Sequence, residues 1–471
     1  MPQRRDSLSW LHLQRDNTTP LHRQIEDALR SAILTSRLPA GVRLPSSRSL
    51  ATDLGIARST VTEAYEQLVA EGYLQSASGR GTRVAEDLPA RAAVASPATR
   101  LPAQSQARPR GRWLSPSLPA TDAFPLAEWQ RIGNRLMREN PAEWMDYSDP
   151  AGLPALREAI SRYLQEQRGL RCEPGRVLVV SGSQQALDLI SRATRGPVWL
   201  EEPGYVGIRD VFEGRPCAPL PVDNEGCRID ALPDPMPSGV VVVTPTHQYP
   251  LGATLSLPRR LALLAKASQS GSWIIEDEYG ADYCFRGRPP QPLQALDDAQ
   301  RVIYVGSFSK TLFPGVRLGF MVVPEALKDR LTQLRRRTDG FSAPLAQGQL
   351  AAFISGGRFH AHLRRTRALY ARRREALLDA LSELPDVFQV LPGDAGLHFT
   401  CVFVDEDMDE TAFCAAARHQ DIQLSPLSDL YFDQAPRRGV LIGFANTPED
   451  AIPALVTHLK AIADSLRPAS R

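Results

Sequence analysis

VGSFSKTLFPGVRLGF, residues 305–320, is the stretch that decides the fold of the larger part of this chain. It continues a β-branched run that begins at Val302, and then turns through serines, a lysine and a proline-glycine pair. Similar apolar runs, separated by helical segments, occupy residues 177–180, 198–205, 240–245 and 273–279. Such alternation is typical of parallel strands covered by helices on both faces. The sequence therefore predicts an α/β fold here.

Lys310 is the residue in this stretch that points to chemistry. The chain has only four lysines, which are Lys266, Lys310, Lys328 and Lys460. Of these, only Lys310 lies in a turn that can hold a phosphate beside its amine. The amine can form a Schiff base with the aldehyde of pyridoxal 5'-phosphate, and Ser307, Ser309 and Arg317 can hold the phosphate. A surface lysine in a loop is the alternative for this motif alone.

Two glycine-containing turns favour the same cofactor. In VVSGSQQALDL, residues 179–189, a strand turns into a helix, so the backbone N–H groups of Ser183 and Gln184 would face an anion. In EEPGY, Tyr205 follows a strand and can stack on an aromatic ring. Each motif alone is common in α/β proteins, as a helix start or a packed tyrosine.

The segment WIIEDEY, residues 273–279, ends a predicted strand with acids. Asp277 can pair with a protonated pyridine nitrogen, which makes the ring an electron sink, and Tyr279 can donate to the ring hydroxyl. Acids at a strand end also bind other ligands in α/β folds. The cofactor prediction therefore depends on all these segments together.

The first 84 residues have a different organisation. Apolar residues at helical spacing predict one helix after residue 20, a second from the N-cap Ser46 to the stop at Gly55, and a third over residues 58–71. YLQSASGRGTRVAE then predicts two short strands around a glycine-rich tip. This layout is typical of a winged helix-turn-helix.

The third helix would enter the DNA major groove by its N-terminal end, which carries Arg58, Ser59, Thr60 and Thr62. Arg58 can read guanine bidentately, and the hydroxyls can bind phosphates or base edges. Arg43 and Arg48 can hold phosphates, and Arg80 can reach from the wing. A helical protein-interaction module with solvated arginines is the alternative.

The charge distribution agrees with a polyanion partner for the first part. Residues 1–112 carry 16 basic and 10 acidic residues, a net charge of +6, whereas residues 113–471 have a net charge of −4. A solvated basic face would give the same count. Residues 85–112 are rich in Pro, Ala, Arg and Ser and lack aromatic residues, which predicts a flexible linker.

The first 84 residues, which we call the head, resemble the DNA-binding domain of the GntR superfamily. The resemblance rests on PLHRQIEDALRSAI and LPAGVRLPSSRSLATDLGIARSTVTEAYEQLVAEGYL, which match the signature nearly throughout. One departure is Ala57, where a Ser or Thr usually precedes the recognition-helix arginine. We expect this change to remove an N-cap contribution of about 1 kcal/mol, unless Ser59 partly compensates.

Residues 113–471, which we call the body, resemble the fold-type I aminotransferases. The chain as a whole more closely resembles the fusion of such a domain to a GntR head, which is the MocR/GabR subfamily of bacterial regulators. Matching stretches include YSDPAGLPALREAISRYLQEQRGL, EEPGYVGIRDVF, VTPTHQYPLGATLSLPRRLALL and IIEDEYGADYCF. The resemblance implies that Lys310 forms the Schiff base, Asp277 faces the pyridine nitrogen, and Tyr279 faces the phenolic oxygen. It places Ser307, Arg317, Ser183 and Gln184 at the phosphate, Tyr205 beside the cofactor, and His247 with Gln248 where many aminotransferases have Asn-Pro-x-Gly.

Two departures from the family pattern concern the body. The acid motif often reads E-D-D-Y-D, but here it is Glu276-Asp277-Glu278-Tyr279-Gly280. Aminotransferases usually carry a C-terminal arginine that holds the substrate carboxylate, and the corresponding stretch, residues 440–452, offers Asn446 and no arginine. Arg437 or Arg438 is the nearest substitute in sequence.

The resemblance implies a DNA-binding transcription regulator that senses pyridoxal phosphate or an amine or amino-acid effector. An active aminotransferase with an appended DNA-binding domain is the alternative, and a scaffold that has lost its chemistry is a third. The expected partners are operator DNA and a second copy of the chain, in a head-to-tail domain-swapped homodimer. We expect no metal, no membrane contact and a cytoplasmic location, because no CxxC pair, signal peptide or long apolar window occurs.

The predicted architecture is a winged helix-turn-helix joined to an α/β fold-type I aminotransferase-like domain with large and small lobes. The predicted boundaries are residues 1–84 for the head, 85–112 for the linker and 113–471 for the body. Within the body, we expect the large lobe over about 155–345 and the small lobe over about 113–154 and 346–471.

Overall fold

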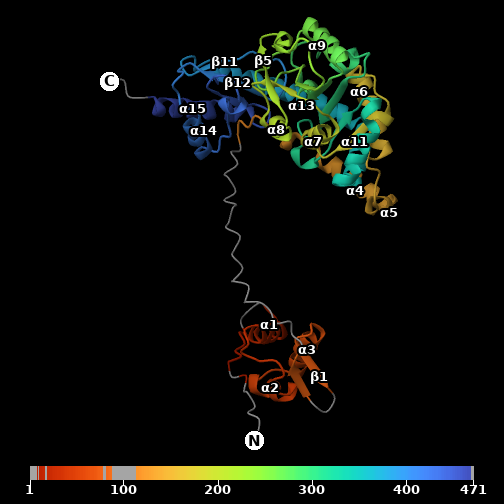
Figure 1. The fold of residues 1–471 in the computed structure, drawn as a ribbon. Helices are drawn as coiled ribbons and strands as arrows, with labels where there is room; N and C mark the ends of the chain where they lie inside the picture. Colours follow the sequence, from red (N-terminus) through yellow and green to blue (C-terminus); the bar gives the residue numbers. More distant parts are fainter. Residues whose placement is uncertain (1–7, 9, 16–18, 78–80, 87–112, 468–471) are drawn as a thin grey trace. The chain divides into compact units, whose positions relative to one another are not determined.

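The computed structural model describes residues 8, 10–15, 19–77, 81–86 and 113–467 of the chain (Figure 1). The chain divides into two units, residues 1–107 and residues 108–471. Most of the predicted linker, residues 87–112, lies outside the described residues. The domain and lobe boundaries given above stay predictions.

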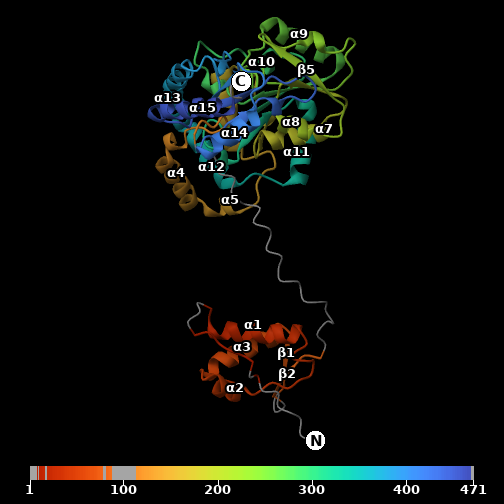
Figure 2. The same cartoon turned by 90° about the vertical axis from the view of Figure 1, so that its left-hand side faces the viewer.

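The first unit is a three-helix module with a small β wing (Figure 2). Its elements are α1 (Leu21–Leu34), α2 (Ser47–Leu54), α3 (Arg58–Ala70), β1 (Leu74–Ala77) and β2 (Gly81–Val84). The two strands pair antiparallel. Ile25 and Leu29 of α1 are fully buried with Leu68 of α3, because apolar residues at helical spacing share one face.

The helix ends of the head follow from local sequence. The Ser46 side chain accepts a hydrogen bond from the Ser49 backbone N–H at 3.1 Å, and Gly55 ends α2 in the left-handed region with φ of 63°. Both predicted ends of α2 are confirmed. Ala57 is the N-cap of α3 and provides no side-chain hydrogen bond, and Ser59 does not replace it.

The second unit is built around an eight-stranded sheet in the order β3-β10-β9-β8-β7-β4-β5-β6. The strands are β3 (Val177–Val180), β4 (Val198–Glu202), β5 (Cys217–Asp223), β6 (Gly226–Cys227), β7 (Val240–Val243), β8 (Trp273–Glu278), β9 (Val302–Ser307) and β10 (Gly319–Val322). The predicted parallel pairing holds from β5 through β4, β7 and β8 to β9. Strand β10 differs, because it runs antiparallel between β3 and β9.

Helices cover both faces of this sheet (Figures 1 and 2). The helices of this part of the unit are α4 (Leu126–Glu139), α5 (Pro141–Met145), α6 (Pro154–Arg168), α7 (Ser183–Ala193), α8 (Val206–Val211), α9 (Leu257–Ser270), α10 (Leu293–Leu296), α11 (Glu325–Thr338), α12 (Pro344–Ser355) and α13 (Arg358–Leu381). Side chains alternate along β3: Leu178 packs with α7 and α11, and Val179 packs with α6 and α12. The continuous apolar runs of the sequence are explained by this two-sided burial.

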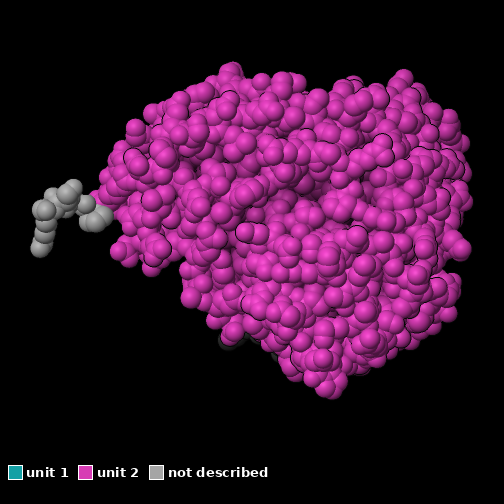
Figure 3. All heavy atoms as spheres, turned by 90° about the horizontal axis from the view of Figure 1, so that it is seen from above, with its two compact units in different colours: residues 1–107 teal, residues 108–471 magenta. Residues whose placement is uncertain are grey.

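A second, antiparallel sheet lies in the C-terminal part of the same unit, in the order β11-β12-β14-β13. Its strands are β11 (Phe388–Val390), β12 (His398–Phe403), β13 (Ser425–Pro426) and β14 (Gly439–Gly443), and α14 (Glu410–His419) and α15 (Ile452–Leu466) pack beside it. One apolar core joins this sheet to α13 and to β3, so the described atoms of the unit form a continuous body (Figure 3).

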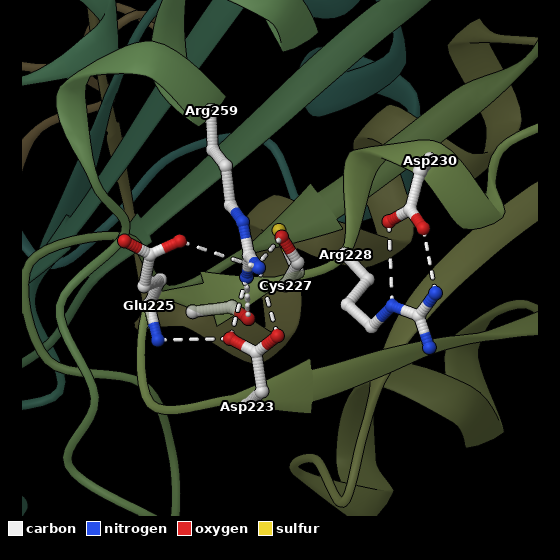
Figure 4. A network of polar contacts seen from close by, with 7 residues as sticks. Asp223, Glu225, Cys227, Arg228, Asp230 and Arg259 are labelled. Carbon is white, nitrogen blue, oxygen red and sulfur yellow. Dashed lines mark hydrogen bonds and ion pairs between the residues drawn. The ribbon is translucent and has the colours of Figure 1, made fainter.

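Arg259 links helix α9 to the β5–β6 hairpin at the edge of the sheet (Figure 4). Its guanidinium binds both carboxylate oxygens of Asp223, at 2.6 and 2.7 Å, and also donates to the Gly226 carbonyl at 2.8 Å. Arg228 and Asp230 form a separate exposed pair at 2.6 Å. These contacts fix the edge of the sheet and do not line the cavity described below.

Three further features of the described residues bear on the predictions. None of their helices combines the length and apolar character that a membrane span requires. No three His, Cys, Asp or Glu side chains among them gather as a metal site. All six cysteines are free thiols.

Candidate functional site

A cavity of about 410 Å³ lies at the end of the large sheet where strands β8 and β9 finish. The predicted cofactor residues in its wall are Ser183, Gln184, Tyr205, Asp277, Tyr279, Ser307, Ser309, Lys310 and Arg317. In open α/β sheets, ligands bind outside the carboxyl ends of the strands. The sheet therefore brings together groups that are more than a hundred residues apart in sequence.

Lys310 lies in the turn that follows β9. Its Nζ donates a hydrogen bond to the Ser117 carbonyl at 2.8 Å. Burial lowers the pKa of this amine to about 8, and the nearby Asp277 carboxylate opposes that shift. The arrangement keeps a substantial fraction of the amine unprotonated near neutral pH, which a nucleophilic lysine needs.

Asp277 lies on β8, with its side chain on the cavity side of the strand. Burial raises its pKa to about 7, and the charge of Glu278 adds to this shift. Glu276 points the other way and accepts hydrogen bonds from the backbone N–H groups of Leu293 and Gln294. Only Asp277 of these three acids faces the cavity, because side chains alternate along a strand.

The opposite end of the cavity is suited to an anion. Helix α7 begins at Ser183, so its first N–H groups lack helical partners. Arg317 follows a short turn in the left-handed region, with φ of 50°, and its guanidinium lies near Gly182. A Cβ at Gly319 would lie 3.1 Å from the Gly182 Cα and 2.8 Å from the Gly306 carbonyl oxygen, so only glycine allows this close approach.

Tyrosines form another wall of the cavity. Tyr249 packs edge-on against Tyr205 and Tyr279, with ring centroids 6.1 and 5.6 Å apart. The Tyr279 hydroxyl is buried and has no hydrogen-bond partner among the described residues. A buried hydroxyl without a partner costs about 1–3 kcal/mol, so a ligand that accepts from it would be favoured.

His247 is the predicted cofactor residue that does not line the cavity. It is buried beside Tyr279, with ring centroids 5.9 Å apart, and burial lowers its pKa to about 4. Its neighbour Gln248 donates to the Pro203 carbonyl at 2.8 Å and thereby supports the loop before Tyr205.

Several wall residues were not predicted from the sequence: Pro116, Ser117, Thr244, Tyr249, Leu397 and His398. Thr244 and Tyr249 flank His247 in a segment that the sequence had marked, so that signal was present. The other four belong to segments without a recognisable motif, and only the fold brings them to Lys310.

The arginine that usually holds a substrate carboxylate has no evident replacement here. Arg437 and Arg438 line a separate groove at the edge of the small sheet, and Asn446 is not among the cavity residues. Among the described residues that line the cavity, Arg317 is the only arginine, and it lies at the anion end.

In the head, the predicted DNA-contacting residues lie mostly on the surface. Arg58 and Ser59 are exposed at the first turn of α3, where Thr60 and Thr62 are half-buried. Arg48 is exposed on α2. Arg43 is also exposed, and its backbone forms an isolated antiparallel β-bridge with Arg83 of the wing strand β2. Arg80 lies outside the described residues.

Comparison with known proteins now identifies the family. Residues 21–84 match the bacterial regulatory proteins of the gntR family, and residues 117–459 match aminotransferase class I and II. The chain is 39% identical over 455 residues to a protein of Rhizobium meliloti named 'Probable rhizopine catabolism regulatory protein MocR', and the match covers 92% of each chain. The chain belongs to the MocR/GabR subfamily of the GntR superfamily.

Other MocR/GabR relatives and aminotransferases agree with this assignment. The pyridoxine biosynthesis transcriptional regulator PdxR of Corynebacterium glutamicum is 32% identical over 442 residues, which cover 92% of this chain and 94% of PdxR. The crystal structure of a kynurenine aminotransferase of Pyrococcus horikoshii superposes with a TM-score of 0.70 at 26% identity, over 76% of this chain and 92% of that one. This MocR/GabR member is therefore a transcription regulator with an aminotransferase-like body, and the predicted family and fold class are confirmed.

Proposed function

We propose that this regulator holds pyridoxal phosphate in the cavity at Lys310, and that it responds there to pyridoxal phosphate itself or to an amine or amino-acid effector. The main support is the meeting of a half-buried lysine, an aspartate and an anion site in one cavity. Pyridoxal phosphate supplies an aldehyde that condenses with an amine, and a ring that withdraws electrons.

The side chains present fit this cofactor. Tyr279 has a buried hydroxyl without a partner, which suits the phenolic oxygen. Asp277 can hold the pyridine nitrogen protonated, because a carboxylate stabilises the adjacent cation. The start of α7 with Ser307, Ser309 and Arg317 can bind the phosphate. Ser183 and Gln184 belong to the same end, and Tyr205 can cover the ring.

Cofactor uptake should depend on pH through Lys310. At about pH 7.5, a pKa of about 8 leaves about a quarter of the amine unprotonated, against about one part in a thousand for an ordinary lysine. We expect the rate of uptake by cofactor-free protein, followed by visible absorbance, to rise with pH and level off above about 8. The same measurement on N-acetyl-lysine provides the comparison, and a protein rate that still rises at pH 10 would contradict the prediction.

The head is proposed to bind double-stranded operator DNA with α3 in the major groove. We expect Arg58→Ala to weaken specific binding by about 1–3 kcal/mol, measured by fluorescence anisotropy, with a smaller effect on unrelated DNA. Arg23→Ala on α1 removes the same charge from an exposed site and serves as the control. Equal losses in the two variants would show that Arg58 contributes only charge.

We further propose a head-to-tail homodimer, in keeping with the subfamily resemblance. Exposed apolar side chains on and after α4 and α5 support an interface in this region. They are Leu126, Met145 and Tyr147, with exposed fractions of 57%, 72% and 89%. Sedimentation of the purified chain at twice the monomer mass is the expected result.

The active aminotransferase remains the second candidate, because the cavity retains Lys310 and Asp277. The absence of a second cavity arginine among the described residues favours sensing over turnover of ordinary amino acids. Sustained keto-acid formation from an amino donor and acceptor would favour the enzyme.

A further inference from the structure

The chain just before α1 is a packed part of the head. We call residues 10–15 the N-terminal segment. Leu11 in this segment is only 4% exposed and belongs to the same apolar core as the three helices. The guanidinium of Arg37 lies over the Trp10 ring, 4.5 Å from its centroid. The segment therefore has a defined place on the head, set by its own side chains.

The end of the N-terminal segment is tied to the first turns of α1. The Gln14 backbone N–H donates to Gln24 Oε1 at 2.9 Å, and Gln24 Nε2 donates back to the Gln14 carbonyl at 3.0 Å. The same Nε2 donates to the Thr19 carbonyl at 2.8 Å. These bonds fix the backbone on which the next residue, Arg15, is carried.

Arg15 reaches from this segment to the turn of the helix-turn-helix. Its Nη2 donates a hydrogen bond to the Gly55 carbonyl at 2.9 Å. Gly55 ends α2 and begins the turn to α3. A Cβ at Gly55 would lie 3.4 Å from this Nη2, so the guanidinium packs directly on the turn. A cation at the C-terminal end of a helix is also favoured by the helix dipole.

The start of α3 has few other contacts that fix it locally. Ala57 is the N-cap and provides no side-chain hydrogen bond. Arg58, the first residue of α3, is exposed, and its Nε lies 3.4 Å from the Ser47 Oγ. A hydrogen bond of that length is weak. The direction of the Arg58 side chain therefore depends on where the turn holds the first residues of α3.

We propose that Arg15 is a positioning residue for DNA reading: by holding the Gly55 carbonyl, it sets the start of α3 and with it the direction of Arg58. This inference rests on the proposed function, because α3 is taken to enter the major groove. It extends the DNA-reading module to the chain before α1. Arg15 acts through Arg58 and contacts neither bases nor phosphates.

The test measures DNA binding by the full-length protein with two duplexes. One is selected by the unmodified protein from a random-sequence library, and the other has the same bases in shuffled order. Fluorescence anisotropy gives the affinity for each at several salt concentrations, because the slope of log affinity against log salt reports phosphate contacts. Arg15 is exposed, so Arg15→Met leaves the core intact. Arg23→Met removes the same charge from an exposed site on α1 and serves as the control.

We expect Arg15→Met to weaken binding of the selected duplex about three- to tenfold, as loss of one hydrogen bond to a charged group allows. Binding of the shuffled duplex should fall no more than in Arg23→Met. The salt slope should stay unchanged, whereas loss of a phosphate contact would lower it by about 1. Arg15→Lys, which keeps a donor, should restore part of the affinity. In an Arg58→Ala background, Arg15→Met should cost little further affinity.

A second variant tests the same contact without replacing Arg15. Gln24→Leu releases the Gln14 backbone and should reduce the preference for the selected duplex in the same direction.

Three results would overturn the proposal. They are an undiminished preference in Arg15→Met, equal losses for both duplexes with a lower salt slope, and additive losses in Arg15→Met with Arg58→Ala. The second of these would make Arg15 a phosphate contact. If the unmodified protein selects no duplex, the proposed DNA binding fails and this inference with it; if it selects one that Arg15→Met binds equally well, only the role of Arg15 fails.

Discussion

Lys310→Ala is expected to abolish covalent attachment of pyridoxal phosphate and leave DNA binding largely intact. After borohydride reduction, mass spectrometry should find the cofactor on the unmodified protein and none on the variant. The reason is that the Lys310 amine alone lies in the cavity, with a pKa lowered to about 8. Operator affinity should change by less than about 1 kcal/mol without effector, because DNA contacts lie in the head.

The other lysines provide matched controls for this experiment. Lys328 on α11 is paired with Glu325 at the surface, and Lys266 on α9 lies near Asp234. Lys328→Ala removes a lysine of the same unit and should retain the covalent cofactor. A persistent adduct in Lys310→Ala would show that the cofactor assignment is wrong.

The parts of the site that sequence could predict are those fixed by local geometry. A lysine in a serine-rich turn, a helix that starts after glycine and an aspartate at a strand end each have a short-range cause, and the sheet topology brings them together. His247 lies in a marked motif, yet it packs behind Tyr279, because a motif does not reveal how deep its side chains lie. His398 and Ser117 could not be predicted, since only long-range packing places them beside Lys310.

The same distinction holds for the fold. The head was predicted almost completely, because caps such as Ser46 and Gly55 act within one turn of a helix. In the body, the apolar runs predicted parallel strands, which is correct from β5 through β4, β7 and β8 to β9, but does not hold for β10. Strand β10 is as apolar as its neighbours, and its antiparallel pairing follows from the tight turn at Arg317, which returns the chain directly beside β9.

Arg168→Met should destabilise the body more than any surface change. Arg168, at the end of α6, donates to the Glu278 carboxylate at 2.9 Å, and the two side chains are only 4% and 5% exposed. Without the arginine, a buried carboxylate loses its counter-charge, which costs about 3–5 kcal/mol. Chemical denaturation with urea, followed by fluorescence, measures this loss.

The pH dependence distinguishes an unpaired charge from simple loss of packing. Burial already raises the pKa of Glu278, and Arg168 lowers it. Removing Arg168 therefore raises the folded-state pKa further above the unfolded value, so the stability of Arg168→Met relative to the unmodified protein falls as pH rises through that pKa. The deficit should be larger at pH 8 than at pH 5.5, and a deficit that is the same at both would indicate packing alone.

Replacing both partners separates the ion pair from the fold it supports. Arg168→Met with Glu278→Leu removes both charges of this pair and leaves neither partner unpaired, so most of the lost stability should return. Glu278 also raises the pKa of the adjacent Asp277. The double variant should therefore fold yet hold Asp277 with a lower pKa, which strengthens its charge toward the pyridine nitrogen. We expect the cofactor to stabilise the double variant at least as much as the unmodified protein, measured as the shift in Tm on adding pyridoxal phosphate. A smaller shift would mean that Arg168 and Glu278 position Asp277 as well as neutralise each other.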